Sequence, residues 1–208
     1  MKKTLSIFLA ITTILSSNLS AFAATKSLEN QAGVGFVTVT ITDLNTGETL
    51  TLSEEDLQID QTMTENDNGI KTETVIANIS LPSSDISPQS SVTDGGCTTR
   101  IELNIDYEQS GTLYRMKTAS GSFTVLDNAF THSNRMVKLA NYDWAQTSYI
   151  ETYYPSSSSF SYSPFTNWID SNYPPAVLAG YAKCTVSRGG SSWEVKCEHT
   201  IISNGSAL

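Results

Sequence analysis

Only two histidines are available for acid–base chemistry in this chain, His132 and His199. The sequence contains no G-x-S-x-G elbow, HExxH, C-x-x-C, P-loop or GxGxxG motif. A hydroxyl nucleophile activated by His132 would need a fixed position and an acid that orients the imidazole, and no spacing indicates either. We therefore expect no catalytic residue and no enzyme. A hydrolase with His132 as its base is the alternative.

Ligands for a metal ion are equally scarce. A zinc site needs three or four ligands, and two histidines beside cysteines that we expect to be bridged leave few. Residues 65–68 could offer oxygen atoms to Ca²⁺, but an EF-hand counted back from Gly69 places Thr64 first and Val75 last. An Asn-Gly hairpin turn explains the segment without calcium. We predict no metal and no cofactor.

Three cysteines in an exported chain predict one disulfide and one free thiol. Cys184 and Cys197 flank a segment with Gly-Gly-Ser-Ser at its centre, which is typical of a hairpin. A turn closed symmetrically about Gly190 and Ser191 places Cys184 directly opposite Cys197 on one face. We predict a Cys184–Cys197 disulfide. A bridge from Cys97 to either of them is the alternative.

Aromatic residues are concentrated in one part of the chain. Tyr153 and Tyr154 are neighbours and must point to opposite faces of a strand. Aromatic residues among Ser and Asn in loops are typical of surfaces that recognise glycans or proteins, although burial in the core is an alternative role. We hypothesise that Tyr153 or Tyr154, with Trp144 or Trp168, lines a ligand-binding face. Of the 19 aromatic residues, 11 lie in this stretch: Tyr142, Trp144, Tyr149, Tyr153, Tyr154, Phe160, Tyr162, Phe165, Trp168, Tyr173 and Tyr181.

The elements that must position these residues are strands, because apolar and polar residues alternate from Gly35 onward. Closing the first hairpin on a four-residue loop pairs Ile41 with Leu50 and Val39 with Leu52. A second hairpin is expected around residues 65–69. We expect these two hairpins to form a small sheet, which must pack on the rest of the chain.

The alternation continues through the second half of the chain. Residues 133–146 are ambiguous between a strand and a short helix. Residues 178–186 are expected to pair with residues 195–201, with His199 inward, hydrogen-bonded and opposite Ala182. Short strands with frequent turns predict an all-β fold, an antiparallel β-sandwich of Ig-like or jelly-roll-like type, or two packed β subdomains.

Residues 1–23 have the pattern of a signal peptide. Lys2 and Lys3 precede an apolar run, residues 5–15, that is too short to span a bilayer, and Ala21-Phe22-Ala23 is an A-x-A cleavage site. No lipoprotein cysteine or wall-sorting motif follows. We expect a secreted, extracellular protein of bacterial type, without membrane insertion after signal cleavage.

Charge divides the mature chain into two parts. Residues 24–96 contain 12 acidic residues and two lysines, whereas residues 97–208 contain nine acidic and eight basic residues. We expect an acidic β region at 24–81, a Ser/Pro/Gly linker at 82–96 and a β-sandwich domain at 97–208. The acidic part could also be a pro-region that is removed after export. Acidic chains are repelled by phosphate backbones, so nucleic acid is not expected as a partner.

These expectations lead to one function and one alternative. We expect a non-catalytic module that binds a glycan or another cell-surface ligand through the aromatic loops. The alternative is a protein-binding effector, an inhibitor or bacteriocin-like factor, whose acidic region engages a basic partner.

Overall fold

The computed structural model describes residues 35–52, 58–81, 97–145 and 149–204. These residues form strands and no helix, which confirms the all-β class. The predicted signal peptide and linker lie outside the described residues. The strands are β1 (Phe36–Asp43), β2 (Thr49–Leu52), β3 (Gln58–Glu65), β4 (Ile70–Ile79), β5 (Thr99–Ser110), β6 (Leu113–Val125), β7 (Thr131–Tyr142), β8 (Ile150–Tyr153), β9 (Ser159–Tyr162), β10 (Ile169–Asp170), β11 (Ala176–Arg188) and β12 (Ser191–Asn204).

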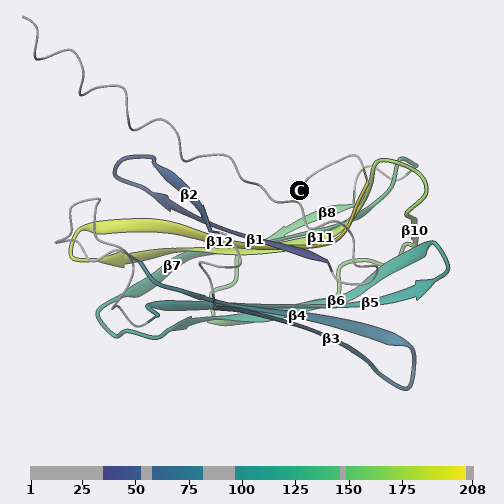
Figure 1. Cartoon of the computed structure of the whole chain (residues 1–208), viewed down its shortest axis with the longest axis horizontal. Coiled ribbons are helices and arrows are strands. Elements are labelled where there is room, and N and C mark those ends of the chain that lie inside the picture. The colour runs from purple at the N-terminus through teal and green to yellow at the C-terminus, as the bar shows by residue number, and fades with distance from the viewer. Residues whose placement is uncertain (1–34, 53–57, 82–96, 146–148, 205–208) are drawn as a thin grey trace, which may run out of the picture. The chain divides into compact units, whose positions relative to one another are not determined.

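The strands belong to two six-stranded antiparallel sheets, which Figure 1 shows as two layers. Sheet A has the order β2-β1-β12-β11-β7-β8, and sheet B has the order β10-β6-β5-β4-β3, with β9 also paired to β6. The expectation that the first two hairpins form a small sheet of their own is wrong. The β1–β2 hairpin extends sheet A beside β12, and the β3–β4 hairpin extends sheet B beside β5. Each sheet therefore combines strands from both parts of the sequence.

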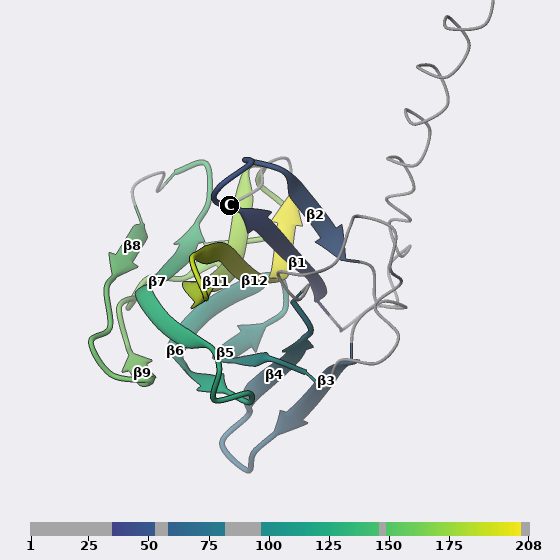
Figure 2. The ribbon, with the colours of Figure 1, turned by 90° about the vertical axis from the view of Figure 1, so that its left-hand side faces the viewer.

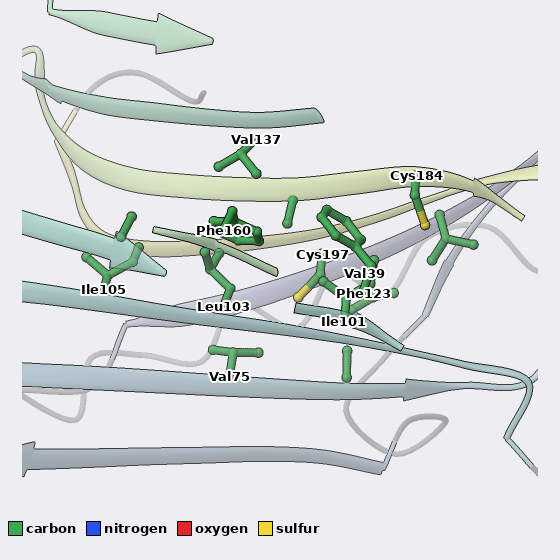
Figure 3. Close-up of a cluster of buried hydrophobic side chains, with 14 of the residues drawn as sticks. Val39, Val75, Ile101, Leu103, Ile105, Phe123, Val137, Phe160, Cys184 and Cys197 are labelled. Atoms are coloured by element: carbon green, nitrogen blue, oxygen red, sulfur yellow. The ribbon is translucent and has the colours of Figure 1, made fainter. Parts of the chain in front are cut away.

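Buried side chains of both sheets form one hydrophobic cluster. Figure 3 shows Val39 and Val137 of sheet A with Val75, Leu103 and Phe123 of sheet B in this cluster. Alternation along each strand produces the cluster, since every second side chain faces the same side of a sheet. Burial of these side chains is the main source of stability for the two sheets.

Strand β8 of sheet A lies near β9 of sheet B at one side of the molecule (Figure 2). Aromatic side chains connect the two sheets there. Tyr153 of β8 stacks on Tyr162 of β9, with ring centroids 3.9 Å apart and an interplanar angle of 10°. Phe160 of β9 packs on Phe123 with centroids 5.7 Å apart. A side chain at Gly121 would collide with Phe160 and the β5 backbone, so β9 can approach β6 only because this residue is glycine.

The structure tests the two hairpins predicted from the sequence and the segment that was ambiguous between strand and helix. The pairs Ile41–Leu50 and Val39–Leu52 of the first hairpin are confirmed. The second hairpin is also confirmed as β3–β4, with Gly69 at a φ of 72° in its turn. The ambiguous segment 133–146 is a strand as far as Tyr142, where β7 ends, and this strand pairs with β11.

The predicted register of the last hairpin is wrong by two residues. Its turn is Gly189–Gly190, with φ values of 57° and 91°, because a two-residue loop of this kind needs positive φ at both positions. Cys184 therefore lies opposite Val195, and Cys197 lies opposite Ala182. A shift of two residues preserves the inward face, so both cysteines are still buried.

All three cysteines are unpaired in this structure. Cys184 and Cys197 are diagonal neighbours on β11 and β12, and Figure 3 shows their sulfur atoms apart. Diagonal positions are further apart than the directly opposed positions that the predicted disulfide needs. The same shift places His199 opposite Gly180, where Ala182 was expected.

Candidate functional site

Two exposed aromatic rings lie together on loops of sheets A and B. Trp144 follows β7 and is 58 % exposed, and Tyr173 follows β10 and is 54 % exposed. Their ring centroids are 6.3 Å apart at an interplanar angle of 54°. Large exposed aromatic side chains in contact with each other are characteristic of recognition surfaces. We call Trp144 and Tyr173 the aromatic pair.

Hydrogen bonds hold the loops that carry the aromatic pair. Asp143 accepts the backbone N–H of Ala145 and of Asp170, both at 3.1 Å, and so joins the two loops. The N–H of Tyr173 donates to the carbonyl of Asp170 at 3.1 Å. The carbonyl of Ser171 accepts the side chain of Asn204 at 3.0 Å. These bonds reduce the conformational entropy that a ligand would otherwise have to remove on binding.

A buried asparagine near the end of β7, three residues before Trp144, holds this strand to the segment before β10 and to β6. The side chain of Asn141 donates to the carbonyl of Asn167, and the side chain of Asn167 donates to the carbonyl of Asn141, both at 3.0 Å. The Asn141 side-chain oxygen accepts the N–H of Met116, which belongs to sheet B, at 3.2 Å. The polar groups of the fully buried Asn141 are thus satisfied, as burial requires.

The four residues predicted to bind a ligand lie in different places. Trp144 belongs to the aromatic pair, but Tyr153 is half-buried against Tyr162 and packs on the core. Tyr154 is 75 % exposed in the loop after β8. Trp168 is half-buried, and the guanidinium of Arg115 lies 4.8 Å from its ring centroid. Only Trp144 and Tyr154 of the four therefore expose most of a ring.

Strand geometry keeps Tyr154 away from Trp144. Tyr153 pairs with Val137, whereas Trp144 follows Tyr142 at the far end of β7. The five steps along the strand from Val137 to Tyr142 span roughly 17 Å at the usual rise per residue. One small ligand therefore cannot touch both rings. Sequence reasoning counted Tyr173 in the aromatic stretch but did not select it, because its contact with Trp144 arises from the tertiary fold.

A second group of chemically active side chains is buried between the sheets. Tyr107 donates its hydroxyl to Oε1 of Glu73 at 2.8 Å, and Nε2 of His199 lies 2.9 Å from Oε2 of the same carboxylate. An ionised carboxylate only accepts, so Nε2 of His199 carries the hydrogen. The N–H of Gly35 donates to Oε2 at 3.1 Å, and Gln61 donates to the Gly35 carbonyl at 2.8 Å. We call these five residues the Glu73 cluster.

The Glu73 carboxyl keeps its charge despite its burial. Burial alone raises the pKa of Glu73, but the hydrogen bond and charge of His199, the Tyr107 hydroxyl and the Gly35 N–H together lower it below its usual value. Burial and the neighbouring carboxylate also raise the pKa of Tyr107, so its hydroxyl stays a donor. Glu73 and His199 are 1 % and 0 % exposed, so a dissolved substrate cannot reach them. The arrangement supports structure rather than acid–base catalysis.

A signal for this cluster is visible in the sequence. Glu73, Tyr107 and His199 each extend an alternating row of inward apolar residues, such as the row that ends in Cys197. The prediction that His199 is inward and hydrogen-bonded is confirmed, but its partner Glu73 is 126 residues away in the other sheet. Strand alternation identifies the inward faces, and only the packing of the sheets pairs them.

His132 is placed differently from the base of a catalytic triad. Its Nε2 lies 2.8 Å from the hydroxyl of Thr99, a residue with 0 % exposure. Burial and the charge of Arg135 lower the pKa of His132. No carboxylate is hydrogen-bonded to this ring in the part of the chain that the structure describes. The contact joins β5 of sheet B to β7 of sheet A.

The described residues contain no cluster of three or more His, Cys, Asp or Glu side chains that could hold a metal ion. In the segment considered for calcium, the Asn66 side chain accepts the N–H groups of Asn68 and Ile70 at 2.9 and 3.1 Å.

No helix long and apolar enough to cross a membrane occurs among the residues described. Comparisons of the chain with protein-family models, curated proteins and solved structures found no match.

Proposed function

We propose that this protein is a secreted, non-catalytic β-sandwich that binds a cell-surface or environmental glycan through the aromatic pair. The observation that carries the proposal is the contact of two mostly exposed rings, Trp144 and Tyr173, on hydrogen-bonded loops. Exposed rings on fixed loops offer an apolar surface to a ligand at low cost in conformational entropy. The N–H of tryptophan and the O–H of tyrosine can also form hydrogen bonds with hydroxyl groups. Sugars present both kinds of surface to such a site.

The β-sandwich supplies the rigid support that this role requires. Sheets A and B share one core. Asn141 joins the end of β7 to β6, and Asp143 joins the loop of Trp144 to the end of β10, which directly precedes the loop of Tyr173. Binding residues on loops held by a rigid scaffold are the usual arrangement in antiparallel β proteins. The export signal in residues 1–23 would deliver such a module to extracellular glycans.

The experiment is retention of the purified mature chain on bacterial cells, isolated cell wall and insoluble polysaccharides at low and high salt. We expect retention to persist at high salt, because contacts through aromatic rings are screened far less than charge pairs. We expect Trp144→Ala and Tyr173→Ala each to weaken binding roughly 30-fold, the effect of losing a binding hot spot.

Tyr154→Ala is the matched control, because Tyr154 is at least as exposed but lies far from the pair. Equal loss of retention in all three variants would point to nonspecific adhesion and contradict the proposal. Retention that salt abolishes would instead support the alternative, a protein-binding effector that uses the acidic residues. Tyr153→Ala is expected to destabilise the fold, since Tyr153 stacks on Tyr162.

A further inference from the structure

The β1–β2 hairpin is weakly held by the hydrophobic core. Of its 12 strand residues, only Val39 and Ile41 are buried, and no residue of β2 is. Its attachment to the rest of sheet A is the ladder between β1 and β12. Elements with few buried apolar contacts open locally at lower free energy than the core of a protein. A single polar anchor therefore contributes a large share of what holds the hairpin in place.

The Glu73 cluster supplies such an anchor at the first residue before β1. Gly35 is held from both sides of its backbone, by Oε2 of Glu73 at its N–H and by the amide of Gln61 at its carbonyl. A Cβ at this position would lie 2.8 Å from Cε1 of His199 and still closer to the Thr200 carbonyl, so only glycine fits. Two side chains of sheet B are thereby hydrogen-bonded to the residue that directly precedes β1 of sheet A.

We propose that Glu73 is an acid-sensitive latch: its ionised carboxylate holds the start of β1, and its protonation at acid pH releases the β1–β2 hairpin from β12 while the other strands stay paired. A protonated carboxyl gives up an acceptor site and the attraction to the His199 ring. The N–H of Gly35, the Tyr107 hydroxyl and Nε2 of His199 then compete for the acceptor sites that remain on the neutral Glu73 carboxyl group. Release of the hairpin would make β12 the edge of sheet A in place of β2 and expose its backbone groups to pairing with another strand.

The surroundings of Glu73 define the pH range of the latch. The titratable groups around it are His199 on β12, Tyr107 on β5 and Tyr114 on β6, and Glu65 of β3 acts on Tyr107. Because the folded-state pKa of Glu73 lies below its usual value of 4.5, its contribution is complete above that value and disappears as the pH falls through the lowered pKa. Release is therefore expected in acid and not at neutral pH.

The test is hydrogen–deuterium exchange of the full mature chain, read by mass spectrometry and corrected for the intrinsic exchange rate at each pH. Glu73→Gln mimics the protonated state, and we expect it at pH 7 to lower the protection of residues 36–52 at least tenfold. Protection of β5, β6 and β11 should stay within twofold of the unmodified protein. The unmodified protein should show the same selective loss when the pH is lowered stepwise from 7 to 2, once the pH has fallen through the lowered pKa of Glu73.

Glu102→Gln, on the neighbouring strand β5 but half-exposed, is the control and should leave the hairpin unchanged. Gln61→Leu removes only the hydrogen bond to the Gly35 carbonyl and should lower hairpin protection selectively but less, which tests the latch even if Glu73→Gln fails to fold. Uniform loss of protection in every strand in Gln61→Leu would overturn the proposal. An unmodified hairpin that keeps its protection at every pH from 7 to 2, or loses it only together with the other strands, would overturn it as well.

Discussion

Individual residues of the Glu73 cluster determine how the two sheets are aligned. Glu73 lies in sheet B and His199 in sheet A, and both are almost completely inaccessible to water. Burial of an ionised carboxylate often adds little net stability, because removing the charge from water offsets the attraction of its partners. Its stronger effect is on specificity, since another alignment of the sheets would leave Glu73 only the Tyr107 hydroxyl of its own sheet and remove the contacts with His199 and Gly35. We infer that the cluster sets the register between sheets.

Removal of the Tyr107 hydroxyl measures how much its hydrogen bond to Glu73 contributes to stability. Tyr107→Phe keeps the buried ring but removes the donor to Oε1 of Glu73, so we expect the free energy of unfolding to fall by about 1.5–3 kcal/mol. Urea denaturation at pH 7 measures the change. Tyr154→Phe, at an exposed ring, should be neutral. A Tyr107→Phe protein as stable as the original would show that the hydrogen bond contributes nothing.

The thiols make a second prediction at the level of residues. Burial raises the pKa of Cys184 and of Cys197 to about 12, and half-buried Cys97 is more accessible than either. Since thiolates are the reactive species, we expect an alkylating reagent to modify only Cys97 in the folded protein. In urea without reductant, all three thiols should react, as the unpaired cysteines of the structure require. Only one modified cysteine in urea would instead establish a disulfide.

At the level of the strands, the conformation of a hairpin turn determines the register in which the two strands pair. The β11–β12 turn consists of Gly189 and Gly190, both at positive φ, and its position sets which residues of β11 and β12 face each other. The centre of the Gly-Gly-Ser-Ser segment suggested a turn one residue further on, at Gly190 and Ser191, but symmetry within that segment is not a physical constraint on the loop. Backbone conformation is, because only glycine adopts these angles without a steric penalty.

Substitution in this turn tests that explanation. Gly190 has a φ of 91°, so Gly190→Ala should lower the free energy of unfolding by about 1–2 kcal/mol through strain on the backbone. Gly190→Asn should lower it less, because asparagine tolerates positive φ better than alanine. Thermal denaturation followed by circular dichroism measures both variants. Ser156→Ala, in an exposed loop, is the control, and a harmless Gly190→Ala would contradict the assigned turn.

At the scale of the whole molecule, the sequence divides into an acidic and a balanced part, but the fold does not. Strand β1 pairs with β12 through eight residue pairs, and β4 pairs with β5 through ten. The inward side chains of β1 and β4, Val39 and Val75 among them, lie in the same cluster as those of the later strands. Removing the acidic part would expose this cluster to water.

Two measurements follow from this arrangement. We expect the protein isolated from its natural source to retain residues 35–81, so its intact mass should exclude a chain that begins at residue 97. A fragment of residues 97–208 expressed alone should lack cooperative unfolding, because it loses four strands and the partners of their buried side chains. A soluble fragment with a cooperative transition would restore the possibility of a pro-region.

Sequence alone determined much of this protein because strand alternation is a local property. The inward faces, the first hairpin pairs Ile41–Leu50 and Val39–Leu52, and the inward placement of His199 all follow from a period of two and the turn chemistry. The crowding of aromatic residues between Tyr142 and Tyr181 was equally visible. The sequence did not show which of those rings would be exposed.

Only the tertiary structure decided which distant residues meet. It separated Trp144 from Tyr154 and joined it to Tyr173, because β7 and β8 run antiparallel while the loop after β10 returns to the end of β7. It also brought Glu73 to His199 by stacking two sheets that share no hydrogen-bonded strands. Contacts between sheets depend on how complete faces pack together, and no local pattern along the chain encodes that choice.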